Sequence, residues 1–198
     1  MRFTKMEGIG NDYIYINGFE ETVPDPSALS VRMSRYHFGC GADGLIMILP
    51  SKIADFRMQM FNNDGSESGM CGNGIRCVAK YCHDRGLTDK TEITVESFGQ
   101  VKYLRLFTEN GRVKQVRVDM GEPILTPGDI PVVKADGSAY DDDYRVIDEP
   151  ISAGNREWHM TCVSMGNPHA VVFVDDVAGF ELEKYGPLFE NHKMFPKR

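Results

Sequence analysis

Met70-Cys71-Gly72-Asn73-Gly74 marks the start of a helix in this sequence. Gly86, directly after Arg85, has the place of a helix C-terminal cap. Between these two points, apolar residues recur at i, i+3, i+4 and i+7, the spacing of one buried helix face: Ile75, Val78, Ala79 and Cys82. The sequence therefore predicts an amphipathic helix that begins directly after Cys71.

The position of Cys71 at this helix start also predicts chemistry. Unpaired backbone N–H groups and the positive end of the helix dipole favour a thiolate over a thiol. The same N–H groups can hold a carboxylate or a developing oxyanion, and Gly72 and Gly74 let a ligand approach the backbone. The alternative is that Cys71 is only a small buried residue beside a turn. The glycines and Asn73 favour an acid–base role for the thiol.

The composition limits the class of protein. The chain has 198 residues, enough for one large domain or two small ones, and its net charge of −7 argues against nucleic acid or an anionic membrane as a partner. The longest apolar runs, residues 45–49 and 170–174, are far shorter than the roughly 20 residues that span a bilayer. Five cysteines, an odd number, and a start without an apolar signal core indicate a cytoplasmic protein with reduced thiols.

Further elements follow from the pattern of apolar residues. A helix is expected over residues 26–36, with Asp25 as its cap and Leu29, Met33 and Tyr36 on its buried face. Strands are expected over residues 45–49, 56–60, 93–95, 101–107 and 116–120, and Asn110-Gly111 predicts a hairpin between the last two. Residues 123–149 are rich in turn formers and are interpreted as a domain crossover and a solvated loop. Strands over 158–163 and 170–174 and a helix over 181–190 complete the chain.

The context of two patterns argues against a dinucleotide site and a metal site. Gly39-Cys40-Gly41-Ala42-Asp43-Gly44 matches the dinucleotide pattern G-x-G-x-x-G, but a helix precedes it and a strand follows, the reverse of what that motif needs. It is interpreted as a glycine-rich turn near the ligand. Cys77 and Cys82 do not share a helix face and no C-x-x-C spacing occurs, so no metal site is expected and both are assigned to helix packing.

Several polar residues stand in turn-like settings beside apolar runs. Asn11, Asn62 and Asn167 are of this kind, and with Asn73 they are either turn formers or neutral donors and acceptors for a zwitterionic ligand. His169 is either a polar residue of the site or a structural one.

Four segments together resemble the diaminopimelate epimerase family. Their order and spacing match over essentially the whole chain, including residues 192–196: Gly8-Ile9-Gly10-Asn11-Asp12-Tyr13, His37 to Gly44, Phe61 to Cys77, and Met165-Gly166-Asn167-Pro168-His169. Proline racemases and phenazine-biosynthesis isomerases share the fold of that family, but not the Asn11-Asp12 segment together with Cys71 to Gly74.

The resemblance implies an α+β fold of two similar domains, each with a curved, mainly antiparallel sheet around a central helix. Residues 1–119 would form the first domain, which carries Cys71, and residues 120–198 an incomplete second domain. The implied activity is cofactor-free interconversion of LL- and meso-diaminopimelate, in lysine and peptidoglycan biosynthesis. The partner is then a small amino-acid substrate, with neither nucleic acid nor membrane involved, and a homodimer is left open.

The resemblance also assigns residues. Cys71 matches one of two catalytic cysteines, and His169 matches a position important for catalysis. Gly44 departs from the family, because some members have there a glutamine that contacts substrate. Five residues match substrate-binding positions: Asn11, Asn62, Gly72, Asn73 and Asn167.

Family members continue well beyond Arg198 and supply the second cysteine there. Because inversion at a carbon needs a base on one face and an acid on the other, the 198-residue chain is expected to be inactive alone. The alternatives are a binding remnant without catalysis and a related isomerase of the same fold with different chemistry.

Overall fold

A computed structural model describes residues 1–197 and divides them into two compact units. The first unit spans Met1–Met120, and the second begins at Gly121. Each has its own sheet and its own hydrophobic core. The expected α+β fold class is confirmed. No helix in the described part of the chain is long and apolar enough to cross a membrane.

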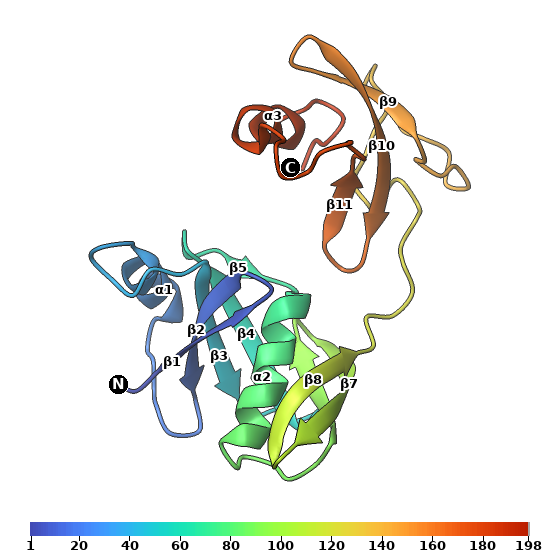
Figure 1. Ribbon diagram of the computed structural model, residues 1–198. Coiled ribbons are helices and arrows are strands. Elements are labelled where there is room, and N and C mark those ends of the chain that lie inside the picture. The colour runs from blue at the N-terminus through green and yellow to red at the C-terminus, as the bar shows by residue number, and fades with distance from the viewer. Residues whose placement is uncertain (198) are drawn as a thin grey trace. The chain divides into compact units, whose positions relative to one another are not determined.

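The first unit is an eight-stranded mixed sheet that wraps around one helix (Figure 1). The strand order is β1-β2-β3-β4-β6-β7-β8, and β5 pairs with β4. The pairs β2–β3 and β4–β6 are parallel, and the others are antiparallel. The helix, α2 (Gly72–Asp84), contacts β1, β2, β7 and β8. The strands are β1 (Thr4–Gly8), β2 (Asn11–Asn17), β3 (Gly44–Leu49), β4 (Phe56–Asn62), β5 (Glu67–Ser68), β6 (Glu92–Ser97), β7 (Gln100–Glu109) and β8 (Arg112–Val118).

The predicted apolar face of α2 forms the centre of this unit. All four of its predicted residues are buried, and they pack in one cluster with side chains of the sheet: Ile75, Val78, Ala79 and Cys82. Helix α2 ends where predicted, since Arg85 is its C-cap and Gly86 has φ +74°. This φ belongs to the left-handed region, where glycine has no steric cost.

Helix α1 (Pro26–Ser34) covers the other face of β3 and β4. It begins as predicted, because the Asp25 carboxylate accepts a hydrogen bond from the Ala28 N–H at 2.9 Å. It ends two residues before the predicted Tyr36, which is exposed rather than buried. Ser30 is buried instead, and its hydroxyl donates to the carbonyl oxygens of Phe61 and Asn62 at the end of β4.

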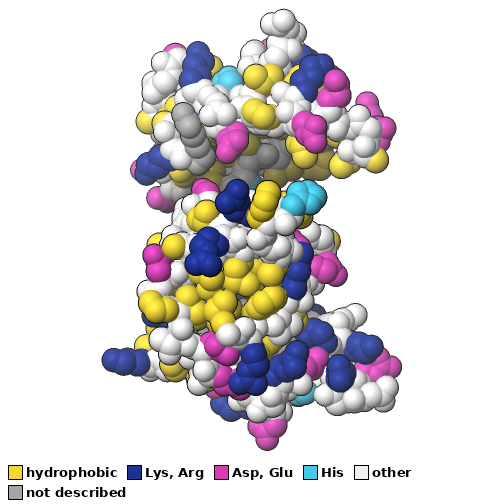
Figure 2. Space-filling model, turned by 90° about the vertical axis from the view of Figure 1, so that its left-hand side faces the viewer, with side chains coloured by type: hydrophobic (Ala, Val, Ile, Leu, Met, Phe, Trp, Pro, Cys, Tyr) yellow, Lys and Arg dark blue, Asp and Glu magenta, His cyan; other side chains and the backbone are white. Residues whose placement is uncertain are grey.

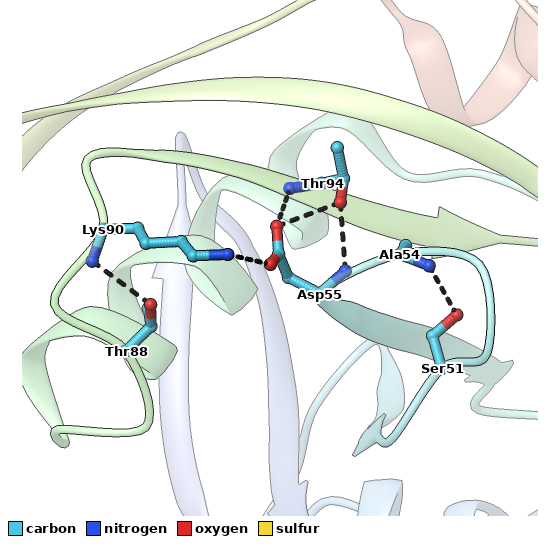
Figure 3. A network of polar contacts seen from close by, with 6 residues as sticks. All are labelled: Ser51, Ala54, Asp55, Thr88, Lys90 and Thr94. Atoms are coloured by element: carbon cyan, nitrogen blue, oxygen red, sulfur yellow. Dashed lines mark hydrogen bonds and ion pairs between the residues drawn. The ribbon is translucent and has the colours of Figure 1, made fainter.

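A polar network fixes the start of the parallel pair β4–β6 (Figure 3). The Asp55 carboxylate accepts from the Lys90 ammonium at 2.6 Å and from the Thr94 N–H at 2.8 Å. In return, the Asp55 N–H donates to the Thr94 hydroxyl at 3.0 Å. These bonds join two chain segments that the whole of α2 separates in sequence, and so fix the crossover.

The hairpin between β7 and β8 confirms the turn predicted from Asn110-Gly111. Asn110 has φ +51° and Gly111 φ +75°, as a two-residue turn with both central residues left-handed requires.

The second unit is a three-stranded antiparallel sheet with one helix. The strand order is β11-β10-β9, built from β9 (Glu149–Ala153), β10 (Arg156–Ser164) and β11 (Pro168–Val171), and the helix is α3 (Leu182–Glu190). Trp158 on β10 makes edge-on ring contacts with Phe180, Tyr185 and Phe189. The interpretation of residues 123–149 as a solvated loop is partly wrong, because Ile130 and Val132 are buried in the core of the second unit.

Candidate functional site

Cys71 is the N-cap of helix α2. Its backbone is extended, and its sulfur accepts a hydrogen bond from the Gly74 N–H at 3.2 Å. The residue is half-buried. The first turn of α2 thus presents one backbone N–H, that of Gly74, to the sulfur atom.

The thiol also has a hydrogen-bond acceptor. Its sulfur lies 3.1 Å from Oδ1 of Asn11, which is 60 residues away in sequence at the start of β2. Asn11 Nδ2 in turn lies 2.5 Å from Oδ2 of Asp43. A carboxylate can only accept, so the amide nitrogen of Asn11 faces Asp43 and its oxygen faces Cys71. The thiol is therefore the donor in its contact with Asn11.

Asp43 belongs to the glycine-rich segment before β3 and is held from both directions. Its Oδ2 accepts from the Asp12 N–H at 3.1 Å, and its own N–H donates to the Asp12 carbonyl at 2.9 Å. Lys5 pairs with the Asp12 carboxylate at 2.7 Å and donates to the Gly41 carbonyl at 2.5 Å. The segment is thus tied to β1 and β2 beside Cys71. Sequence reasoning missed Asp43 and Lys5, because no local spacing shows that they meet.

Gly72 and Asn73 form the first turn of α2 with Arg76. The Arg76 guanidinium donates to the Gly72 carbonyl at 2.9 Å and to the Asn73 side-chain oxygen. The Asn73 amide is therefore orientated by a charged donor, with its oxygen toward Arg76.

Asn62 lies at the end of β4 and shapes a turn. Its N–H donates to the Ser66 carbonyl at 2.8 Å, and its side-chain amide donates to the Ser66 hydroxyl at 3.0 Å. In the parallel and antiparallel registers around β3, Gly44 stands opposite both Asn62 and Tyr13. The turn-forming alternative for Asn62 accounts for these contacts.

Gly44 has no room for a side chain. A Cβ atom there would lie 2.1 Å from the Phe61 carbonyl oxygen and 2.9 Å from Cε1 of Tyr13. The Tyr13 ring fills this space. Burial raises the pKa of Tyr13 to about 12, and the nearby Cys71 sulfur adds to the rise. The phenol is therefore neutral over the whole physiological range.

In the second unit, Asn167 and His169 line one pocket of about 330 Å³. Asn167 lies in the turn between β10 and β11, and His169 stands opposite Val163 in the β10–β11 register. Both side chains are exposed. Cys162 lines the same pocket, but it is buried inside strand β10 and burial raises the pKa of its thiol to about 11.

The remaining thiols of helix α2 are packing residues. Cys77 and Cys82 are buried, and burial raises the pKa of both, that of Cys82 to about 12.

Among the described residues, no group of three or more His, Cys, Asp or Glu side chains could hold a metal ion. Figure 2 shows acidic and basic side chains interspersed around apolar ones on one face of the molecule.

Comparison with known proteins extends these observations. A protein-family model described as diaminopimelate epimerase matches residues 3–126. The diaminopimelate epimerase of Agathobacter rectalis is 76% identical over 198 residues, which are all of this chain and 70% of that protein. The diaminopimelate epimerase of Acetivibrio thermocellus is 54% identical over all of this chain and 68% of that protein.

Solved structures agree at the level of the fold. A hydroxyproline epimerase from Agrobacterium vitis matches with a TM-score of 0.62 at 13% identity, over 86% of this chain and 50% of that one. A probable proline racemase from Agrobacterium radiobacter matches with the same TM-score of 0.62 at 16% identity, over 86% of this chain and 51% of that one. The chain spans about half the length of these structures.

Proposed function

Because this chain belongs to the diaminopimelate epimerase family, we propose that its Cys71 is one of two acid–base groups that interconvert LL- and meso-diaminopimelate without a cofactor. The observation that carries the proposal is the Cys71 thiol at the N-terminus of α2, between the Gly74 N–H and the Asn11 amide. Residues 1–119 are then the first epimerase domain and residues 120–198 part of the second.

The reaction removes a proton from the α-carbon and returns one to the opposite face. The negative charge that develops at this carbon delocalises into the adjacent carboxylate. Backbone N–H groups at the start of α2 would stabilise that charge, because they are fixed donors at the positive end of a helix dipole. The Gly74 N–H would stabilise the Cys71 thiolate in the half-reaction in which the sulfur gives up its proton.

The amide side chains are suited to the charged ends of an amino acid. Each has a neutral donor and a neutral acceptor, so it can bind an ammonium or a carboxylate without titrating. We assign Asn11, Asn62, Gly72, Asn73 and Asn167 to substrate binding, and His169 to catalysis from the second unit.

The test is to replace Cys71 in the full-length protein as its gene encodes it. Cys71→Ala should abolish the interconversion, since loss of a positioned proton-transfer group costs about 10²–10⁴-fold. Cys71→Ser should retain little activity, because a hydroxyl is far harder to ionise than a thiol. The assay follows the stereoisomers and the exchange of the α-proton with deuterated solvent, with no pyridoxal phosphate or metal added.

Cys40→Ser is the matched control. Cys40 is exposed and has no proposed role, so its loss should leave the rate unchanged. Full activity of Cys71→Ala would overturn the proposal and would direct attention to His169 as the acid–base group.

A further inference from the structure

Asp43 occupies a decisive place beside the proposed acid–base group. It lies in the glycine-rich segment, where neither the G-x-G-x-x-G pattern nor the family resemblance gives it a role. Its Oδ2 accepts two hydrogen bonds at once, from Asn11 Nδ2 at 2.5 Å and from the Asp12 N–H at 3.1 Å. The second bond fixes the carboxylate to the backbone of β2, and the first then fixes the amide of Asn11.

We propose that Asp43 is a positioning residue, which holds the oxygen of the Asn11 amide toward Cys71, where that oxygen accepts the hydrogen of the thiol. The argument rests on which groups can donate. Asp43 cannot donate to Asn11, so the NH₂ group of the amide must face Asp43. The oxygen at the other end of the same amide then accepts the proton of the thiol at 3.1 Å.

The direction of the effect follows from the two groups at the sulfur. The Gly74 N–H, at 3.2 Å, favours the thiolate because it donates to the charged form. The Asn11 oxygen favours the thiol, because an acceptor stabilises only the form that carries the proton. If the amide turned round, its NH₂ group would face the sulfur and both neighbours would favour the thiolate. The orientation of one amide therefore decides whether an acceptor or a donor faces the Cys71 sulfur.

Other ionisable groups near the sulfur do not take over this function. Tyr13 and Tyr15 approach it from β2 and Cys77 from α2, and burial raises the pKa of all three, so they are neutral at pH 7. Asp12 is paired with Lys5 at 2.7 Å, which offsets its charge. Arg76 donates to the first turn of α2.

The experiment measures how fast iodoacetamide alkylates Cys71 as a function of pH, by mass spectrometry of the Cys71 peptide. The variants are Asp43→Ala, which removes the acceptor, and Asp43→Asn, which removes the charge but leaves an oxygen that can accept from Asn11 and Asp12. Asp43→Ala should raise the rate of alkylation at pH 7 about tenfold, because the freed Asn11 amide can turn its NH₂ group toward the sulfur. Asp43→Asn should raise the alkylation rate by a factor several-fold smaller than Asp43→Ala does.

A second pair of variants separates positioning from charge. In an Asn11→Leu background there is no amide to orientate, so Asp43→Ala and Asp43→Asn should alkylate at the same rate. Equal rates for the two variants already in the unmodified background would overturn the proposal. If Asp43→Ala does not fold, as judged by circular dichroism, Asp43→Ser replaces it, because its hydroxyl is one bond too short to occupy the position of Oδ2.

The importance of Asp43 for catalysis rests on the proposed function, but the alkylation experiment does not depend on it. Alkylation reports the protonation of Cys71 whether or not the protein acts on diaminopimelate. A full-length protein that leaves diaminopimelate unchanged, yet shows the expected alkylation pattern, would refute the proposed function and support the role of Asp43. An active enzyme in which the Asp43 variants do not change the alkylation rate of Cys71 would support the proposed function and refute the role of Asp43.

Discussion

At the scale of single residues, the five cysteines differ sharply in their surroundings. Cys71 is half-buried with one N–H donor at its sulfur, whereas Cys77, Cys82 and Cys162 are buried and have raised thiol pKa values. Brief treatment with iodoacetamide should therefore label Cys71 faster than these three. Peptide mapping measures the labelling, and Cys40, which is exposed, serves as a reference for an unhindered thiol. Equal labelling of all five would remove the physical support for an acid–base role.

Gly44 offers a second test at this scale. Because a Cβ would meet the Phe61 carbonyl oxygen and the Tyr13 ring, Gly44→Ala should lower the free energy of unfolding by about 1–3 kcal/mol. Gly69→Ala is the control in the same unit, since its Cβ would make only ordinary contacts at 3.7 Å with Phe98. Urea denaturation compares the two variants. Equal stabilities would mean that β4 and Tyr13 shift easily to admit a side chain.

The sequence located the first-turn residues of the site but not their partners. Cys71, Gly72 and Asn73 are contiguous, so a local pattern was enough to predict a thiol beside helix N–H groups. Asp43 meets Asn11 only because β2 and β3 are parallel neighbours. No spacing in the sequence encodes that pairing, so a contact between distant segments of this kind appears only in the folded chain.

At the scale of elements, prediction succeeded where a signal was local. Helix α2, the start of helix α1 and the β7–β8 hairpin each carry their own caps or turn residues, and each was confirmed. Strand β2 was missed. It is buried on both faces, between α1 and α2, so Tyr13 to Ile16 form a continuous apolar run without alternation. Strand β11 was predicted at residues 170–174 and lies at Pro168–Val171, because register is set by its partner β10.

The crossover between β4 and β6 should respond to acid. The Lys90 ammonium and the bonds from Thr94 hold the pKa of Asp55 below its usual value, so the stability that this carboxylate contributes is present above its unfolded-state pKa. It is lost as the pH falls through the lowered folded-state pKa. Asp55→Asn should therefore cost about 1–3 kcal/mol at pH 7, and the difference from the unmodified chain should shrink toward zero at about pH 2.

Urea denaturation at both pH values measures this difference. Asp89→Asn is the control, because it removes the same charge beside Lys90. A difference for Asp55→Asn that stays constant with pH would show that the network acts through packing and not through the charge of Asp55.

At the scale of the whole molecule, the two units should differ in local stability. The first has eight strands around a helix with six buried residues, whereas the second has three strands, and none of the residues of α3 is buried. Backbone amides after about residue 122 should therefore exchange with deuterated solvent faster than those of β2, β3 and α2. Exchange followed by mass spectrometry of peptides tests this. Uniform protection along the chain would show that the second unit is stabilised by contacts outside those described.

The sulfur atom that caps α2 has a consequence for protein engineering. Hydroxyl and amide side chains are the preferred N-caps, and a thiol is a weaker acceptor, so Cys71→Ser should begin the helix at least as firmly as the natural residue does. A library selected for heat resistance alone would then tend to replace the sulfur atom to which we assign the proton transfer. A selection for higher thermal stability therefore has to test for the free Cys71 thiol as well as for the melting temperature. Otherwise it will yield stable proteins without activity.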